Sequence, residues 1–195
     1  MIAGKPLIAW TFDAVKKSTL IDKYYVSTED KEIERVSKSY GVEVLKRPAK
    51  LATDNSPTID TLMYHLENDF PEADAVILLQ APSPIRNEGR IDECIKLYLN
   101  NKNKIDTVVT GRIIREYTEY NSENNFKQRQ EWNGFFWDDG GAYIMNSNLI
   151  RKGKVKSSKY LPVYTTREEN IDIDDAFDFW IAEQVLLKRM KDANH

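Results

Sequence analysis

Two aspartates near the C-terminal end of the chain, Asp172 and Asp174, have the residue type and spacing of a divalent-cation site. In an extended segment, residues two apart project to the same side, so their carboxylates can share one ion. Mg²⁺ prefers oxygen ligands and usually holds substrate phosphates as well. The same residues precede a predicted helix, and carboxylates stabilise a helix N-terminus electrostatically. The pair therefore predicts either a magnesium site or a capped helix.

Further polar groups follow predicted strands. In open α/β sheets, ligands bind beyond the carboxyl ends of the strands, so such positions are candidates for substrate contact. The groups are the segment 47–58 with Arg47, Ser56 and Thr58, then Gln80 after the most apolar run, and Arg129 in a later polar stretch. Ser56 and Thr58 can instead cap a helix, and Gln80 can close a strand with a hydrogen bond. Singly, each group is compatible with either interpretation.

Helices and strands alternate along the chain, which predicts an α/β fold with βαβ units. Apolar residues at helical spacing indicate the helices, and short apolar runs indicate the strands. Helices are predicted near residues 6–15, 28–40, 57–70, 91–98 and 174–190, and strands near 24–28, 42–45, 75–79, 107–110 and 140–145. The run 75–79 is continuously apolar, as in a central parallel strand that is covered on both faces.

Three details of these elements concern the candidate site and its surroundings. Residues 112–139 are polar and aromatic without a helical period, and we interpret them as an extended hairpin or arm that leaves the main body. Ser56 is predicted to cap the helix that begins at Pro57. The final helix, beginning near Asp174, is predicted to turn one face toward the core; that face carries Phe177, Trp180, Ile181 and Leu187.

Composition and charge narrow the class of protein. The 195 residues are 41% hydrophobic and 30% charged, which is typical of one globular domain over residues 1–195. No apolar run approaches the roughly 20 residues that span a bilayer, and no signal-peptide pattern opens the chain. The one cysteine, Cys94, cannot form an intrachain disulfide, so a cytoplasmic location without membrane association is expected. The net charge of −3 argues against nucleic-acid binding.

Six segments in a fixed order carry a resemblance to a known family. They are GKPLIAWT, VSTED, RPAKLATDNSPTID, LLQAPSPIR, RQ followed by GGAYI, and DIDDAFD. Together they resemble successive blocks of the cytidylyltransferases that make CMP-sialic acid and related CMP-sugars, over nearly the whole chain. The third and fourth segments are the most specific.

The resemblance implies a Rossmann-like, three-layer α/β fold with a mostly parallel sheet and a small dimerisation arm at about 112–139. It also implies an enzyme that joins CTP to an acidic keto-sugar, sialic acid or a related nonulosonic acid, and releases pyrophosphate with the help of Mg²⁺. The working unit implied is a homodimer, because the arm of one subunit would reach into the site of its partner.

Residue by residue, the resemblance assigns roles to the candidates named above. Arg47, Ser56 and Thr58 match positions that contact cytosine, and Gln80 matches the glutamine that meets the sugar. Asp172 and Asp174 match the metal pair. Arg129 matches an arginine that reaches from the arm toward the sugar carboxylate, for which a guanidinium fork is well suited.

The chain departs from the family pattern at its beginning. Family members begin with a strand and a glycine-rich loop that wraps the triphosphate, and these 195 residues contain no such loop. Glycine amides and basic side chains are what phosphate binding needs, so two functions stay open. One is an active cytidylyltransferase; the other is a truncated, non-catalytic remnant that binds nucleotide or only dimerises. Lack of the first strand is also expected to leave a sheet edge open.

Other features bear on the substrate. Where the family has Arg-Pro-Asn-Gly-Ala, the chain has Trp137-Asp138-Asp139-Gly140-Gly141, which brings two acids close to the expected acidic sugar. A nucleotidyltransferase for a neutral hexose is a third possibility, which the segment RPAKLATDNSPTID fits less well.

His65 lies in an apolar helical stripe and is interpreted as a packing residue, without the neighbours of a nucleophilic triad or a zinc site.

Overall fold

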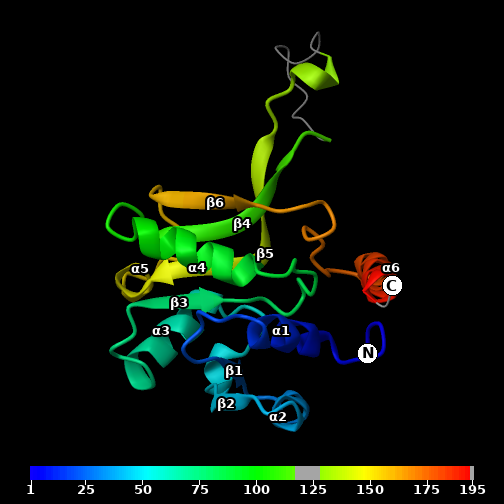
Figure 1. The fold of residues 1–195 in the computed structure, drawn as a ribbon. Helices are drawn as coiled ribbons and strands as arrows, with labels where there is room; N and C mark the ends of the chain where they lie inside the picture. The colour runs from blue at the N-terminus through cyan, green and yellow to red at the C-terminus, as the bar shows by residue number, and fades with distance from the viewer. Residues whose placement is uncertain (117–127, 194–195) are drawn as a thin grey trace.

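The computed structural model describes residues 1–116 and 128–193. Its helices are α1 (Leu7–Lys16), α2 (Lys31–Ser39), α3 (Thr58–Asn68), α4 (Arg90–Asn101), α5 (Ser147–Arg151) and α6 (Ala176–Asp192). Its strands are β1 (Tyr25–Thr28), β2 (Glu43–Lys46), β3 (Ala75–Leu78), β4 (Thr107–Ile114), β5 (Phe135–Asn146) and β6 (Tyr160–Tyr164). Two 3₁₀ turns, η1 (Ala49–Leu51) and η2 (Arg129–Glu131), complete the set. The order of elements confirms the predicted α/β alternation (Figure 1).

The strands form two sheets. β1 and β2 pair in parallel, and the larger sheet has the order β3-β5-β4-β6 (Figure 1). β4 and β6 are parallel, whereas β5 is antiparallel to both β3 and β4. Strands β3, β4 and β6 therefore run in one direction and β5 alone runs against them. The predicted mostly parallel sheet is correct for strand direction, although the insertion of β5 makes its two neighbouring pairs antiparallel.

The two sheets are held side by side by shared helices rather than by a common hydrogen-bond ladder. Tyr24, just before β1, packs into the same cluster as Ala75 and Ile77. On α3, His65 contacts Ser27 of β1, while other side chains of the helix pack against β3. Within residues 1–116 and 128–193, β1 pairs only with β2 and β3 pairs only with β5. In these ranges, β1 and β3 therefore each have one side without a strand partner.

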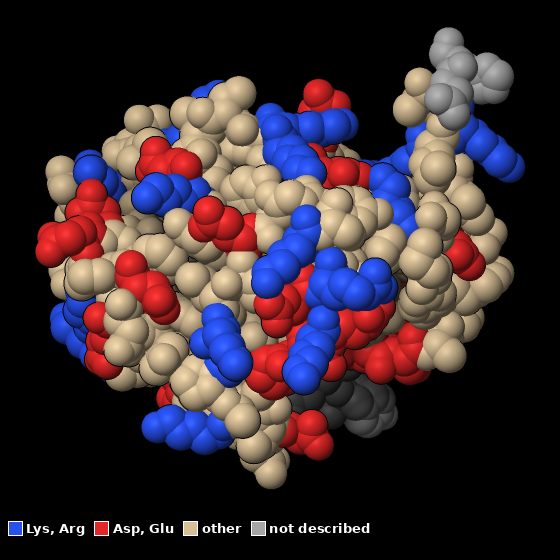
Figure 2. All heavy atoms as spheres, turned by 90° about the horizontal axis from the view of Figure 1, so that it is seen from below, with Lys and Arg blue, Asp and Glu red and all other residues tan. Residues whose placement is uncertain are grey.

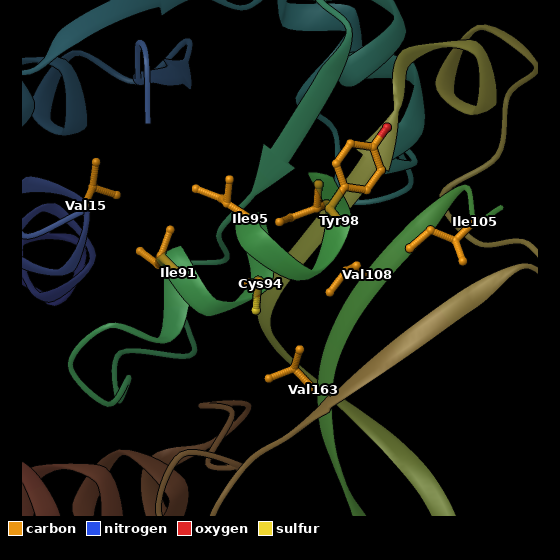
Figure 3. Close-up of a cluster of buried hydrophobic side chains, with 10 residues drawn as sticks. Val15, Ile91, Cys94, Ile95, Tyr98, Ile105, Val108 and Val163 are labelled. Atoms are coloured by element: carbon orange, nitrogen blue, oxygen red, sulfur yellow. The ribbon is translucent and has the colours of Figure 1, made fainter. Parts of the chain in front are cut away.

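Helices cover both faces of the larger sheet, which gives three layers. On one face, α4 and the end of α1 pack onto β4, β5 and β6 to form the main core cluster (Figure 3). Its buried members are Val15, Ile91, Cys94, Ile95, Tyr98, Ile105, Val108, Ala142, Ile144 and Val163. On the other face, α3 and α5 pack onto β3 and β5 around Leu66, Met145 and Ile150.

The apolar run of β3 is explained by these layers. Ala75 and Ile77 pack against the first cluster, and Val76 and Leu78 pack against the second. Successive side chains of a strand point to opposite faces, so a strand with helices on both sides needs apolar residues throughout. The predicted coverage on both faces is confirmed. The predicted central, parallel place is wrong, because β3 stands at the end of the sheet order and pairs with β5 in antiparallel fashion.

The arm begins as a continuation of β4 and β5. Their antiparallel pairing extends past the body of the sheet, from Gly111 opposite Asp138 to Ile114 opposite Phe135 (Figure 1). This pairing agrees with the predicted extended hairpin. Residues 117–127 of the arm lie outside the described residues.

Helix α6 differs from the prediction in its start and in its buried face. It begins at Ala176, and Asp175 caps it in a reciprocal capping box with Asp178. The predicted inward face is wrong for Phe177, Trp180 and Leu187, which are 64%, 56% and 38% exposed. The helix instead buries Ala182 and Leu186, with Phe179 and Val185 beside them, against Ile2, Ala3 and Ile85. Packing against the first residues of the chain selects this other apolar stripe.

Two elements were not predicted from the sequence, α5 and β6. Strand β6 contains Pro162, which lacks the N–H that a central strand needs. It is tolerated because β6 is an edge strand with β4 as its one neighbour among the described residues. None of the helices described is long and apolar enough to cross a membrane. On the face drawn in Figure 2, acidic and basic side chains are intermixed.

Candidate functional site

Asp172 and Asp174 lie on either side of Ile173, in the segment that leads into α6. Ile171 and Ile173 are partly buried in the cluster that holds α6 against the N-terminal residues. The two aspartates are close enough for the charge of Asp174 to raise the pKa of Asp172. Asp175 caps α6 through its side chain, so this helix cap does not account for the carboxylates of Asp172 and Asp174.

The surroundings of Asp172 favour a nearby positive charge. Burial raises the pKa of Asp172, and the negative charges of Asp174 and Asp139 raise it further, while a hydrogen bond from Ser83 acts in the opposite direction. Carboxylates that crowd together in this way are stabilised in the ionised form by a cation. The donor set fits Mg²⁺, which is often bound by one or two carboxylates together with substrate phosphates. No cluster of three His, Cys, Asp or Glu residues that could hold a metal occurs in the described part of the chain.

Gln80 lies next to this carboxylate pair, at the end of β3. Gly140, with a φ of +67°, approaches it so closely that an added Cβ would lie 2.3 Å from Gln80 Oε1 and 2.7 Å from Ser83 Oγ. Ser83 Oγ in turn donates to Asp172 Oδ1 at 3.0 Å. The structure therefore brings Gln80 and Asp172, which are far apart in sequence, to one place around Ser83 and Gly140.

Asp139 is a buried carboxylate behind this cluster, and only 3% of it is exposed. It accepts hydrogen bonds from Thr110 Oγ1 at 2.5 Å, Thr165 Oγ1 at 2.6 Å and the Gly141 amide at 2.9 Å. Its neighbour Asp138 pairs with Lys156. Both acids that the sequence placed near the expected sugar are thus engaged by the protein's own residues.

Arg86 is a second buried charge that sequence reasoning did not single out. Its guanidinium donates to the carbonyls of Gly141 and Gln80, at 2.8 and 2.9 Å, and to Thr11 Oγ1 at 3.0 Å. Burial lowers its pKa to about 10, against the opposing influence of Asp139. The arginine therefore ties the end of β3 to β5 and α1. The only sequence signal for Ser83 and Arg86 was their place in the segment LLQAPSPIR.

Arg47, Ser56 and Thr58 belong to the smaller sheet and the helix that follows it. Arg47, at the end of β2, donates through Nε and Nη2 to Glu29 Oε2 at 2.9 and 2.6 Å, and this contact lowers the pKa of Glu29. Ser56 contacts Thr53 and the carbonyl of Lys50. The structure thus places Arg47 beside the smaller sheet and Ser56 and Thr58 at the start of α3, whereas Gln80 follows a strand of the larger sheet.

The predicted cap of α3 is wrong. The helix begins at Thr58 with Pro57 as its N-cap residue, and no side chain caps it. Ser56 instead closes the loop that precedes the helix, because its hydroxyl is held by Thr53. Thr58 is exposed in the first turn. For Arg129, the structure describes the backbone within η2, and its side chain lies outside the described residues.

His65 does have the neighbours that the sequence did not indicate. Its Nε2 lies 2.7 Å from Ser27 Oγ, and its Nδ1 lies 2.7 Å from Asp69 Oδ2. The interpretation that it lacks triad-like neighbours is therefore wrong, because Ser27 lies 38 residues away and is brought in by strand β1. The side chain is buried at 8% exposure, and the series links β1 to α3. The predicted packing role is consistent with this burial.

A groove of about 610 Å³ lies elsewhere, between α1, the start of α4 and the end of α6. Its charged walls are mutually paired, as in Lys5 with Asp13 and Lys17 with Glu88. Neither Gln80 nor Asp172 lines it. The geometry of the carboxylate pair, rather than the size of this groove, identifies the candidate site.

Comparisons with known proteins found relatives that match nearly the whole chain. A N-acylneuraminate cytidylyltransferase A from Danio rerio is 28% identical over 204 residues, covering 96% of this chain and 46% of the relative. An N-acylneuraminate cytidylyltransferase from Escherichia coli O18:K1:H7 is 28% identical over 202 residues, covering 97% and 48%. The chain thus spans about half the length of the curated relatives it matches.

Solved structures show the same fold at lower identity. A CMP:2-keto-3-deoxy-manno-octonic acid synthetase complexed with CTP superposes with a TM-score of 0.73 at 13% identity, covering 97% of this chain and 90% of that one. The 4-diphosphocytidyl-2C-methyl-D-erythritol synthase of Anaerococcus prevotii gives 0.71 at 14% identity, covering 95% and 88%. The Rossmann-like fold is therefore that of nucleotidyltransferases. Because the family model described as cytidylyltransferase matches residues 1–191, the chain belongs to the cytidylyltransferase family.

Proposed function

We propose that this chain is the nucleotidyltransferase part of an enzyme that transfers CMP from CTP to an acidic keto-sugar, sialic acid or a related nonulosonic acid, and releases pyrophosphate. The names of the relatives, N-acylneuraminate cytidylyltransferases, support this substrate class. The observation that carries the proposal is the clustering of Asp172 with Asp174 and, through Ser83, with Gln80 and Gly140.

In this proposal, Asp172 and Asp174 hold Mg²⁺. The ion neutralises charge that develops on the phosphates of CTP. The crowding of Asp172 with Asp174 and Asp139, which raises the pKa of Asp172, supports a role in binding a cation. The partly buried Ile171 and Ile173 anchor this segment against α6 and the first residues of the chain.

Arg47, Ser56 and Thr58 are proposed to bind the cytosine. Arg47 donates to Glu29 through Nε and Nη2. Because a guanidinium has five N–H donors, others remain for a carbonyl oxygen of the base. The bond to Glu29 also restricts where the guanidinium can lie. Thr58, exposed at the first turn of α3, offers a hydroxyl and a backbone amide that can distinguish cytosine from uracil.

Gln80 and Arg129 are proposed to bind the sugar, with Arg129 reaching the site of the partner subunit in a homodimer. A carboxylate suits a bidentate guanidinium contact. The engagement of Asp138 by Lys156 and of Asp139 by Thr110 and Thr165 supports an acidic substrate. Neither carboxylate is then left facing the sugar without a partner of its own.

Pyrophosphate release from CTP, Mg²⁺ and a panel of acidic keto-sugars tests the proposal. The chain is compared with a form that is extended upstream through its reading frame, because these residues contain no glycine-rich phosphate loop. Release by either form supports the proposal, and release by the extended form alone assigns the triphosphate to the added residues. Folded protein that releases nothing in both forms would favour the alternative, a non-catalytic remnant that binds nucleotide or only dimerises.

A further inference from the structure

Ser83 is a fully buried serine that contacts one of the proposed metal carboxylates. It has 0% exposure, and its hydroxyl oxygen lies 3.0 Å from Asp172 Oδ1 and 2.9 Å from the backbone oxygen of Asp139. A hydroxyl carries one hydrogen and donates to one acceptor at a time. The hydroxyl therefore donates to Asp172 or to Asp139 at any moment, and its position between the two places the segment of Asp172 beside strand β5.

The turn that carries Ser83 is docked onto the aspartate segment itself. Ser83 lies between Pro82 and Pro84, and proline fixes the backbone φ. The carbonyl of Pro82 accepts a hydrogen bond from the amide of Ile173 at 3.0 Å, the residue between the two aspartates. This backbone hydrogen bond joins the neighbour of Ser83 to the neighbour of Asp172, so it sets the distance between the serine hydroxyl and the Asp172 carboxylate.

The backbone oxygen of Asp139, which is the other acceptor of the Ser83 hydroxyl, is also held in place. Asp139 is held by Thr110 and Thr165 through its side chain, so its backbone oxygen does not move freely. Gly140, the next residue, leaves no room for a Cβ beside the serine, which would come within 2.7 Å of Ser83 Oγ. The hydroxyl therefore lies at a place that three separate segments determine.

We propose that Ser83 is a positioning residue, whose hydroxyl fixes the direction in which the Asp172 carboxylate faces a divalent cation. The proposal rests on the proposed metal role of Asp172. Groups that hydrogen-bond a metal ligand fix its orientation, and their loss typically weakens metal affinity by about 10- to 100-fold. Ser83 does not touch substrate in this proposal, and it acts through Asp172.

Binding of Mn²⁺ to the purified chain, followed by electron paramagnetic resonance, tests the proposal without requiring turnover. We expect Ser83→Ala to raise the dissociation constant for Mn²⁺ by about 10-fold. Ser83→Cys, which keeps a side chain of similar shape with a weaker donor, should also weaken binding and covers the case in which the alanine variant folds poorly.

Ser37→Ala is the matched control. Ser37 is also 0% exposed, and its hydroxyl also donates to a backbone carbonyl, that of Ile33, at 2.7 Å, but it lies in α2. The control should lower the thermal midpoint to a similar extent as Ser83→Ala and leave Mn²⁺ affinity unchanged.

The outcomes separate this proposal from the proposed function. If Asp172→Asn weakens Mn²⁺ binding and both Ser83 variants bind as the wild type does, the positioning role is overturned and the metal role stands. If Asp172→Asn leaves Mn²⁺ binding unchanged, the metal role fails and the positioning role fails with it. Weakening by the Ser83 variants and by Asp172→Asn, but not by Ser37→Ala, supports both.

Discussion

Arg90 and Glu169 form a buried, two-point ion pair. Arg90 Nε and Nη2 each lie 2.9 Å from one oxygen of the Glu169 carboxylate, and only 2% of the glutamate side chain is exposed. The same carboxylate accepts from the amides of Asn87 and Thr166. The pair therefore fastens the start of α4 to the loop that leads from β6 to Asp172.

Replacing one partner of this pair should destabilise the protein strongly. Glu169→Gln removes the buried carboxylate that Arg90 contacts at two points and leaves it only the more exposed Glu93, and we expect a loss of about 3 kcal/mol in the free energy of unfolding. Chemical denaturation measures this directly. Glu32→Gln, which breaks the exposed pair of Glu32 with Arg35, is the control and should change nothing measurable; an equal loss there would contradict the assignment.

The same pair predicts how stability depends on pH. Burial raises the pKa of Glu169, but the hydrogen bonds from Arg90, Asn87 and Thr166 outweigh it and leave the pKa below the ordinary value of 4.5. A carboxyl whose pKa is lower in the folded state than in the unfolded state stabilises the protein at pH values above its unfolded-state pKa. The wild type should therefore lose stability as the pH falls below about 4.5, and Glu169→Gln should lose less over this window in the same denaturation series.

Removal of one proposed metal carboxylate should abolish most of the turnover. In the form of the protein that releases pyrophosphate, we expect Asp174→Asn to lower kcat by roughly 100-fold or more, because a ligand of the ion contributes at least as much as the groups that support it. Asp175→Asn is the control, since asparagine caps a helix about as well as aspartate does. Unchanged turnover in Asp174→Asn would remove the metal role.

Gly140 should be needed for the placement of Gln80. In Gly140→Ala, the new Cβ would meet Gln80 Oε1 at 2.3 Å, so we expect the KM for the sugar to rise and stability to fall. Gly41→Ala is the control, because Gly41 also has a positive φ, +74°, with nothing within 4 Å of an added Cβ. Each variant should lose about 1–2 kcal/mol from backbone strain. A KM for the sugar that rises equally in both would contradict the role of Gln80.

Arg129 should affect the sugar more than the nucleotide. We propose that Arg129 binds the carboxylate of the sugar held in the site of the partner subunit. Arg129→Ala should then raise the KM for the keto-sugar by at least about 10-fold, since a charge-assisted pair contributes about 1.5–3 kcal/mol. The KM for CTP should change little. Steady-state kinetics with each substrate varied in turn separates the two, with Arg115→Ala as the control in the same arm. An equal rise in both KM values would argue against carboxylate recognition.

The sequence predicted those parts of the fold that local patterns determine. The apolar run of β3 predicted helices on both faces, and the periodicity of α1, α3 and α4 was strong enough to locate these helices within a few residues. The buried face of α6 could not be predicted, because the helix has two apolar stripes and the choice depends on Ile2 and Ala3 at the other end of the chain. Strand β6 could not be predicted because it contains Pro162, and proline is acceptable in a strand only at the edge of a sheet.

The candidate site shows the same division. Asp172, Asp174 and Gln80 could be proposed from the sequence, because their residue types and their order along the chain are distinctive. Ser83 and Asp139 were not assigned roles, because their importance comes from contacts across 89 and 56 residues of sequence. No periodicity or spacing reports such contacts.

The single cysteine has a practical consequence. Cys94 is 1% exposed in the main core cluster (Figure 3), and burial raises the pKa of its thiol to about 12. In the native state the sulfur is therefore both inaccessible and protonated, and a thiol-specific reagent can attack it only when the core opens. Because the chain has no other cysteine, the rate at which Cys94 is labelled reports how often the layer between α4 and the sheet opens. No engineered probe is needed.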